Sequence, residues 1–183
     1  MAKKLILGAV LGGLILFVWG AISHMLLPVS NYVLFPFTNE EAVKQAVLAN
    51  VPRSGVYFLP YVEGEGMTEA EQEAAMEKAM QGPVVFASIR VGRAQSFGVL
   101  LVNQLLIEML GALIATALLL NARPMSYGRR VLFVVGIALA VGVAGSLPEW
   151  NWYSFSTGYT LAEFFDLIVG WALAGLALAH LAR

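Results

Sequence analysis

Five polar side chains that could bind a ligand or carry protons interrupt the apolar stretches of this sequence. An ionisable side chain inside a membrane span is costly and by default marks a functional site or a buried pair. A histidine with one or two carboxylates can bind a metal, relay protons or form an ion pair. The candidate ligand-binding or proton-linked residues are His24, Asn103, Gln104, Glu108 and Asp166.

The composition indicates that these residues belong to a membrane protein. The chain has 183 residues, of which 59% are apolar and 13% charged, and its mean hydropathy is +0.76. A soluble domain has about 45–50% apolar and about 25% charged residues. The absence of cysteine excludes disulfides, thiolate nucleophiles and zinc sites with cysteine ligands, and two histidines are too few for a three-histidine metal site.

Four apolar runs predict helices that cross the membrane. A spanning helix needs about 20 predominantly apolar residues, and a non-helical span would leave its backbone groups without hydrogen bonds in lipid. The predicted fold is therefore mainly α: a four-helix transmembrane bundle with a small α+β extracytoplasmic insert between the first two spans. The predicted spans are residues 5–27, 97–120, 131–147, which ends before Pro148, and 161–181.

Basic residues predict the orientation, because lysine and arginine are enriched in cytoplasmic loops. Outside residues 28–95, every basic residue lies at the N-terminus, in the 121–130 loop or at the C-terminus, and an even number of spans puts these places on one side. We expect both termini in the cytoplasm, residues 1–27 as an uncleaved first span, 28–95 as an extracytoplasmic α+β domain and 96–183 as the other three spans. The six basic residues are Lys3, Lys4, Arg123, Arg129, Arg130 and Arg183.

The insert carries two helix signals and two strand signals. Thr38 with Glu41, and Thr68 with Glu71, match the capping box that begins a helix, which predicts helices over 39–50 and 69–81. Runs at 55–59 and 84–89 are rich in β-branched and aromatic residues and predict two strands. Such a small core is marginal, so we expect docking on the membrane or on a partner to add stability. The acidic loop at 63–66 lacks calcium-loop spacing and is interpreted as a solvated turn.

Glu108 is the deepest candidate. It lies 11 positions after Phe97, roughly 16 Å along a helix and close to the middle of a bilayer. Gln104 is one turn earlier on the same face, and Gly111 and Ala115 extend that face with small residues suited to helix packing. We expect the face to point into the bundle. Two interpretations of Glu108 stay open: a working site, or a neutral side chain that joins helices through hydrogen bonds.

Asp166 and Glu163 are distinguished by their positions in the fourth span. Thr160 and Glu163 match a third capping box, so Glu163 is predicted to cap that helix. Asp166 lies deeper, and Gly170 and Ala174 follow it on a face of small residues. This face is expected to aim Asp166 at another helix.

His24 lies three residues before the end of the first predicted span, in the outer half with Asn103, Gln104 and Asp166. These groups could converge on one cavity that opens outward. The alternative is a histidine whose ring is wetted at the membrane surface.

Small residues predict close helix contacts in the first and third spans. Gly8 and Gly12 form a GxxxG pair beside Gly13, a pattern that lets helix backbones approach closely. The third span carries a similar set, so we expect a tight bundle without a wide pore. That set is Gly136, Ala140, Gly142 and Gly145.

Several short motifs resemble a family of small bacterial four-helix inner-membrane proteins of uncharacterised function. The likeness includes the first-span pattern Trp-Gly-x-Ile-Ser followed by His or Trp, and the external Trp-Asn-Trp loop. It implies the same fold and an inner-membrane location, and it transfers no activity. The matching segments are residues 19–24, 27–28, 54–60, 82–88 and 150–152.

Three classes of function remain. No nucleophile elbow, phosphate loop or dinucleotide motif is present, and no basic patch favours nucleic acid. The first class is a binding or accessory protein that engages a lipid, a small ligand, a membrane-protein partner or a second copy of itself. The second is proton- or cation-coupled transport through Glu108 and Asp166. The third is a membrane enzyme or metal site that uses His24 with both carboxyls.

Overall fold

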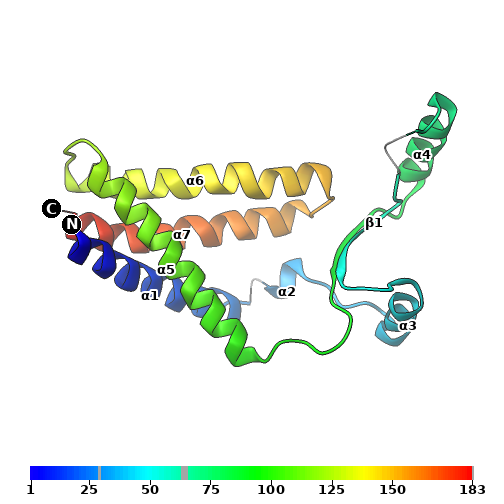
Figure 1. Cartoon of the computed structure of the whole chain (residues 1–183), viewed down its shortest axis with the longest axis horizontal. Coiled ribbons are helices and arrows are strands. Elements are labelled where there is room, and N and C mark those ends of the chain that lie inside the picture. The colour runs from blue at the N-terminus through cyan, green and yellow to red at the C-terminus, as the bar shows by residue number, and fades with distance from the viewer. Residues whose placement is uncertain (29, 63–65, 183) are drawn as a thin grey trace. The chain divides into compact units, whose positions relative to one another are not determined.

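The computed structural model describes residues 1–28, 30–62 and 66–182 of the chain, and it contains two compact units (Figure 1). The helical unit comprises Met1–Phe35, Gln95–Trp150 and Ser156–Arg183. The insert unit comprises Pro36–Ala94 and Asn151–Phe155. The acidic loop interpreted as a solvated turn falls mainly on residues 63–65, which lie outside the described residues.

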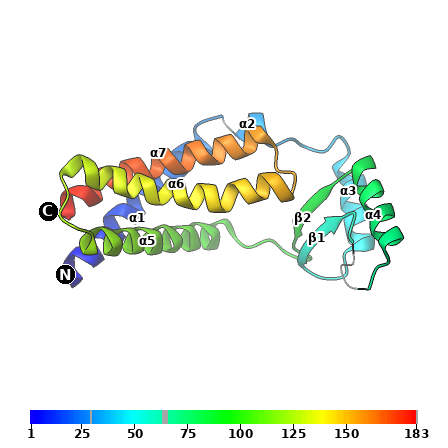
Figure 2. The same cartoon turned by 90° about the horizontal axis from the view of Figure 1, so that it is seen from above.

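Four long helices build the helical unit, as the hydropathy pattern predicts. Each is long and apolar enough to cross a membrane, which fits a multi-pass membrane protein. Both termini and the turn between α5 and α6 lie at the same end of this unit in Figures 1 and 2, and we call this the terminal half. A short helix, α2 (Ser30–Val33), follows the first long one. The long helices are α1 (Ala2–Met25), α5 (Phe97–Asn121), α6 (Tyr127–Trp152) and α7 (Thr157–Leu181).

The predicted boundaries of α6 and α7 are wrong: both helices begin four residues earlier than predicted, at Tyr127 and Thr157, and α6 also ends later. Helix α6 continues through Pro148 to Trp152. Proline removes one backbone donor and crowds the carbonyl four residues earlier, a cost that membrane helices tolerate. Helix α7 begins at Thr157, because the side chain of Ser156 accepts a hydrogen bond from the Tyr159 backbone N–H at 3.2 Å.

Glycines bring α1 against α5 between the terminal end and the middle of the two helices, as their spacing predicts. A Cβ atom at Gly13 would lie 2.7 Å from the Met109 Cα, and one at Gly12 would lie 2.8 Å from the Ala112 Cβ. Real Cβ atoms do not approach other atoms this closely. Residue numbers rise along α1 as they fall along α5, so the two helices run antiparallel with backbones in contact.

A buried layer joins α5, α6 and α7 near the same end. Leu119, Val134 and Leu178 are each no more than 5% exposed and pack in one cluster with Ala115. Tyr127 and Arg130, at the start of α6, form hydrogen bonds to α7 at this end of the unit. The Tyr127 hydroxyl donates to the Leu176 carbonyl at 3.0 Å, and the Arg130 guanidinium donates to the Ala179 carbonyl at 3.2 Å. Both side chains therefore donate to carbonyls in the last turns of α7. The C-terminal end of a helix favours a cation such as the Arg130 guanidinium.

The insert unit contains the two helices and two strands that the sequence predicts. The strands pair antiparallel, with Gly55 opposite Ile89 and Leu59 opposite Val85. Thr68 and Glu71 form the predicted capping box at the start of the second helix. The first helix departs from prediction: Asn39, not Thr38, is its N-cap. The elements are α3 (Glu40–Asn50), β1 (Gly55–Leu59), α4 (Glu69–Gln81) and β2 (Val85–Ile89).

The Asn39 cap has a direct physical cause. Its side-chain oxygen accepts a hydrogen bond from the Ala42 backbone N–H at 3.0 Å. Asparagine is at least as good an N-cap as threonine, so the helix starts one residue later than the threonine would require.

Aromatic contacts supply much of the packing in the insert unit. Tyr153, from the segment between α6 and α7, stacks on Phe86 with ring centroids 4.3 Å apart. Phe58 meets the edges of both rings. Neither α3 nor α4 contains a buried residue. The core of the insert unit is therefore formed by the small sheet and this aromatic cluster.

Candidate functional site

A cavity of about 410 Å³ lies among α1, α5 and α7, in the half of the helical unit away from the termini. We call it the main cavity, and this half the open half. Its walls are mostly apolar, and four aromatic side chains contribute to them. These are Phe17 and Trp19 from α1, Phe97 from α5 and Trp171 from α7.

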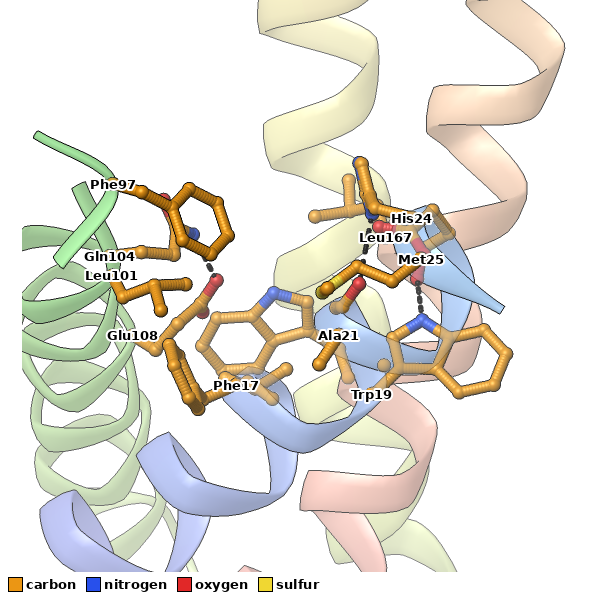
Figure 3. Close-up of a pocket in the computed structure, with 15 residues that line it drawn as sticks. Phe17, Trp19, Ala21, His24, Met25, Phe97, Leu101, Gln104, Glu108 and Leu167 are labelled. Atoms are coloured by element: carbon orange, nitrogen blue, oxygen red, sulfur yellow. Dashed lines mark hydrogen bonds between the residues drawn. The ribbon is translucent and has the colours of Figure 1, made fainter. Parts of the chain in front are cut away.

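Four of the five predicted site residues line the main cavity. His24 comes from α1, Gln104 and Glu108 from α5, and Asp166 from α7. Figure 3 shows Gln104 and Glu108 projecting from one helix and His24 and Trp19 from another. Asn103 is exposed and is not among the residues that line the cavity. Spans far apart in the sequence therefore bring polar groups to one place, as the shared depth of these residues predicts.

Glu108 is held by a side chain from its own helix. The amide Nε2 of Gln104, one turn earlier, donates to Glu108 Oε1 at 2.7 Å (Figure 3). This bond fixes the direction of the carboxyl group. Among the described residues, no side-chain hydrogen bond reaches its other oxygen, Oε2. Gly111, one turn later, packs against the ring of Trp171. From Glu108 to Ala115 the α5 face that the sequence predicts to point inward does so, whereas Gln104 lines the cavity from an exposed position.

Asp166 faces another helix, as the small residues after it predict. Its Oδ1 atom is buried and has no hydrogen-bond partner among the described residues. The indole N–H of Trp19 donates to the Asp166 backbone carbonyl at 3.1 Å. Gly170 leaves the space for this indole, because a Cβ there would lie 2.8 Å from Trp19 Cδ1. Asp166 thus lines the cavity and carries one buried side-chain oxygen that has no hydrogen-bond partner among the described residues.

Trp19 is a site residue that sequence reasoning missed. Its signal was available: a tryptophan inside an apolar helix carries an N–H that needs a partner. The partner is a backbone carbonyl 147 positions away, and sequence spacing does not reveal such a contact.

His24 uses one ring nitrogen within its own helix. Its Nδ1 lies 2.8 Å from Ser23 Oγ and 3.2 Å from the Gly20 carbonyl oxygen. The imidazole is exposed, in keeping with a position at the helix end. Its Nδ1 is therefore occupied locally, and its Nε2 remains for other partners.

A second cavity of about 70 Å³ adjoins the same residues. His24 and Asp166 line both cavities, and Tyr159 and Glu163 line only the second. The prediction that Glu163 caps α7 is wrong, because that helix begins two turns earlier at the Ser156 cap. Glu163 is instead a second carboxyl within α7, three residues before Asp166. The threonine of the apparent capping box, Thr160, donates to the Ser156 carbonyl at 3.1 Å.

The acidic and basic side chains in these cavities are three carboxyls, of Glu108, Glu163 and Asp166, and the imidazole of His24. In the described parts of the chain, no lysine or arginine lines either cavity. Across residues 1–28, 30–62 and 66–182, no three His, Asp or Glu side chains lie close enough to hold a metal ion together. The site therefore offers carboxyl oxygens, one imidazole and aromatic faces, and the predicted metal alternative gains no support from its geometry.

Comparisons of the chain with protein-family models, with curated proteins and with solved structures found no match. Its function is therefore inferred from the residues of the two cavities.

Proposed function

We propose that this protein is an integral membrane binding protein that holds a small amphiphilic ligand in the main cavity. One observation carries the proposal: a largely apolar cavity of about 410 Å³ receives polar side chains from three different helices. Binding sites for small molecules typically have volumes of about 300–1,000 Å³ and combine apolar walls with a few convergent polar groups. The apolar part of the ligand would contact the aromatic walls, and its polar part would contact Gln104, Glu108 and Asp166.

The proposal includes a location and an orientation. A bacterial inner membrane, cytoplasmic termini and an extracytoplasmic segment 28–95 agree with the basic residues outside that segment. In this orientation the main cavity lies in the outer half of the membrane. The insert unit would then engage a membrane-protein partner or a second copy of the chain, which fits the small amount of core that it buries.

Gly20 offers a test of the cavity that leaves its carboxyls in place. Gly20 lines the main cavity, and a Cβ there would meet no atom within 4 Å. Gly20→Leu should therefore fill part of the cavity without disturbing helix packing. Gly136→Leu is the matched control, because Gly136 also has open space but lies on α6 outside the cavity.

Native mass spectrometry of protein extracted gently from its own membrane is the measurement. We expect a small molecule to accompany the wild type and the Gly136→Leu variant, and to be lost from Gly20→Leu. Equal occupancy in all three proteins would contradict the proposal, as would a ligand-free wild type that carries only a partner protein.

A second candidate function is proton-linked transport, and one observation favours it. Because His24 and Asp166 line both cavities, a series of titratable side chains extends from Glu108 to Glu163. Wild-type protein in liposomes would then carry protons when a pH gradient is applied, and Glu108→Gln would abolish the movement. A pH-sensitive dye inside the vesicles measures it, and protein-free vesicles give the baseline.

A further inference from the structure

We propose that the ligand is an organic cation, a primary ammonium group on an apolar body. This inference rests on the proposed function, since it names the chemistry of the molecule that the main cavity holds. The carboxyl groups, the unused acceptors and the aromatic walls of the site support it.

The balance of charge in the cavities favours a cation. Glu108 and Asp166 line the main cavity, and Glu163 joins Asp166 in the second. No lysine or arginine of the described residues accompanies them, so His24 is the one basic side chain present. An ionised carboxyl within a membrane is costly unless a cation compensates it. A bound ammonium supplies that compensation, whereas a carboxylate or phosphate ligand would meet like charge.

Acceptors are arranged to receive N–H groups. Asp166 Oδ1 is buried and has no partner in the described part of the chain, and an unsatisfied buried acceptor is unfavourable until a donor reaches it. Gln104 uses its own donor on Glu108 Oε1 and leaves the second carboxyl oxygen of Glu108 for a ligand. A primary ammonium has three N–H donors and no acceptor, which matches two carboxyl groups in one cavity wall.

Aromatic side chains complete a setting suited to a cation with an apolar body. Indole rings attract cations most strongly among aromatic groups, and more so when water is excluded. Trp19 is held in place by its bond to the Asp166 backbone, and Trp171 by its packing on Gly111. Phe17 and Phe97 extend the apolar wall for the rest of the molecule.

Three probes with one apolar body separate charge from hydrophobicity. Phenylbutylamine is cationic, phenylbutanol is neutral and phenylbutanoate is anionic at neutral pH. We would measure the binding of each to the full chain in nanodiscs of phosphatidylcholine, by calorimetry and by fluorescence of the cavity tryptophans. The amine should bind at least about tenfold more tightly than the alcohol, as one charge-assisted hydrogen bond allows, and the acid more weakly than either.

Variants assign the preference to the cavity. Asp166→Asn and Glu108→Gln should each weaken amine binding by about tenfold and leave alcohol binding nearly unchanged. Glu149→Gln is the matched control, because it removes a carboxylate from an exposed position of α6 that lines neither cavity. It should leave all three affinities unchanged. Thermal unfolding in the same nanodiscs checks that each variant folds. If Asp166→Asn does not fold, the amine affinity of Glu108→Gln alone tests the inference.

The outcomes distinguish this inference from the proposed function. Equal binding of amine and alcohol would overturn the cation inference and leave the binding protein standing, provided that Gly20→Leu removes both. Amine binding that survives Asp166→Asn and Glu108→Gln would overturn it as well, because the cation would then bind outside the cavity. Failure of all three probes to bind would overturn the inference and count against the proposed function.

Discussion

From the terminal end to the middle of the helical unit, α1 approaches α5 so closely that a Cβ at Gly13 would collide with the Met109 backbone. In the open half, the same two helices and α7 surround a cavity of about 410 Å³. Small residues occupy the first region, and aromatic and ionisable side chains occupy the second. The contrast suggests that the terminal half fixes the helices so that the open half can keep a cavity and its polar groups in position.

The contact at Gly13 provides the largest test of this contrast. Gly13→Val would force α1 away from the Met109 backbone, which cannot move as a flexible side chain would. Overpacking of this kind costs about 1–3 kcal/mol, occasionally more, and we expect a loss near the upper end or a failure to fold. Unfolding in detergent by titration with SDS measures it. Gly136→Val, at an open position, should cost far less, and equal losses would remove the distinction between the two halves.

Trp19 tests whether the open half also depends on a specific hydrogen bond. Trp19→Phe keeps an aromatic ring but loses the bond to the Asp166 carbonyl. We expect the free energy of unfolding to fall by about 1 kcal/mol, the net worth of one such bond. The same SDS titration gives the value. A loss as large as that of Gly13→Val would mean that the cavity wall stabilises the fold as much as the glycine contact does.

Glu108 sharpens the comparison, because its two interpretations predict different stabilities. If it serves a ligand, Glu108→Gln should change the free energy of unfolding by less than about 0.5 kcal/mol, as for a surface substitution. If it joins helices as a structural group, the loss should reach about 0.6–2 kcal/mol, the range for hydrogen bonds between membrane helices. Unfolding of ligand-free protein separates the two, with Asn103→Ala as a control at an exposed site on the same helix.

The smallest expected effect lies in the insert unit and depends on pH. Hydrogen bonds from the Thr68 backbone N–H and then from its hydroxyl hold the pKa of Glu71 below its usual 4.5. The stabilisation of α4 is therefore complete above that value and is lost as the pH falls through the lowered pKa. An NMR titration of the α4 amides in the full chain should follow this loss. Glu71→Gln should remove it, and an unchanged pH response in that variant would exclude the capping box as its source.

The sequence predicts elements well where the determining forces are local. Hydropathy over about 20 residues is enough to find the four long helices. In the insert unit, β-branched runs and the Thr68 capping box give the strands and α4 almost to the residue. Predictions went wrong where two local signals compete, as at Asn39 beside Thr38 and at Ser156 before Thr160.

The candidate site was predicted only in part, because it depends on contacts between helices. The position of each residue along its span was enough to predict that four of the five candidates lie together. Depth does not tell which way a side chain points, so Asn103 was included although it is exposed. Glu163 was assigned to a helix end that lies elsewhere, and Trp19 has a partner that only the packing of α1 on α7 creates.

The terminal end of the helical unit limits how a molecule could move through it. Tyr127 and Arg130 bond to α7 carbonyls there, and Leu119, Val134 and Leu178 form a buried layer. Closer to the cavity, Ala112, Ala115 and Leu178 are no more than 1% exposed, so this layer and its neighbours leave no open path to the terminal end among the described side chains. A molecule in the main cavity would therefore enter and leave it through the open half of the helical unit. Passage to the opposite side would require this layer to come apart, at the loss of both bonds and of the apolar contacts between three helices.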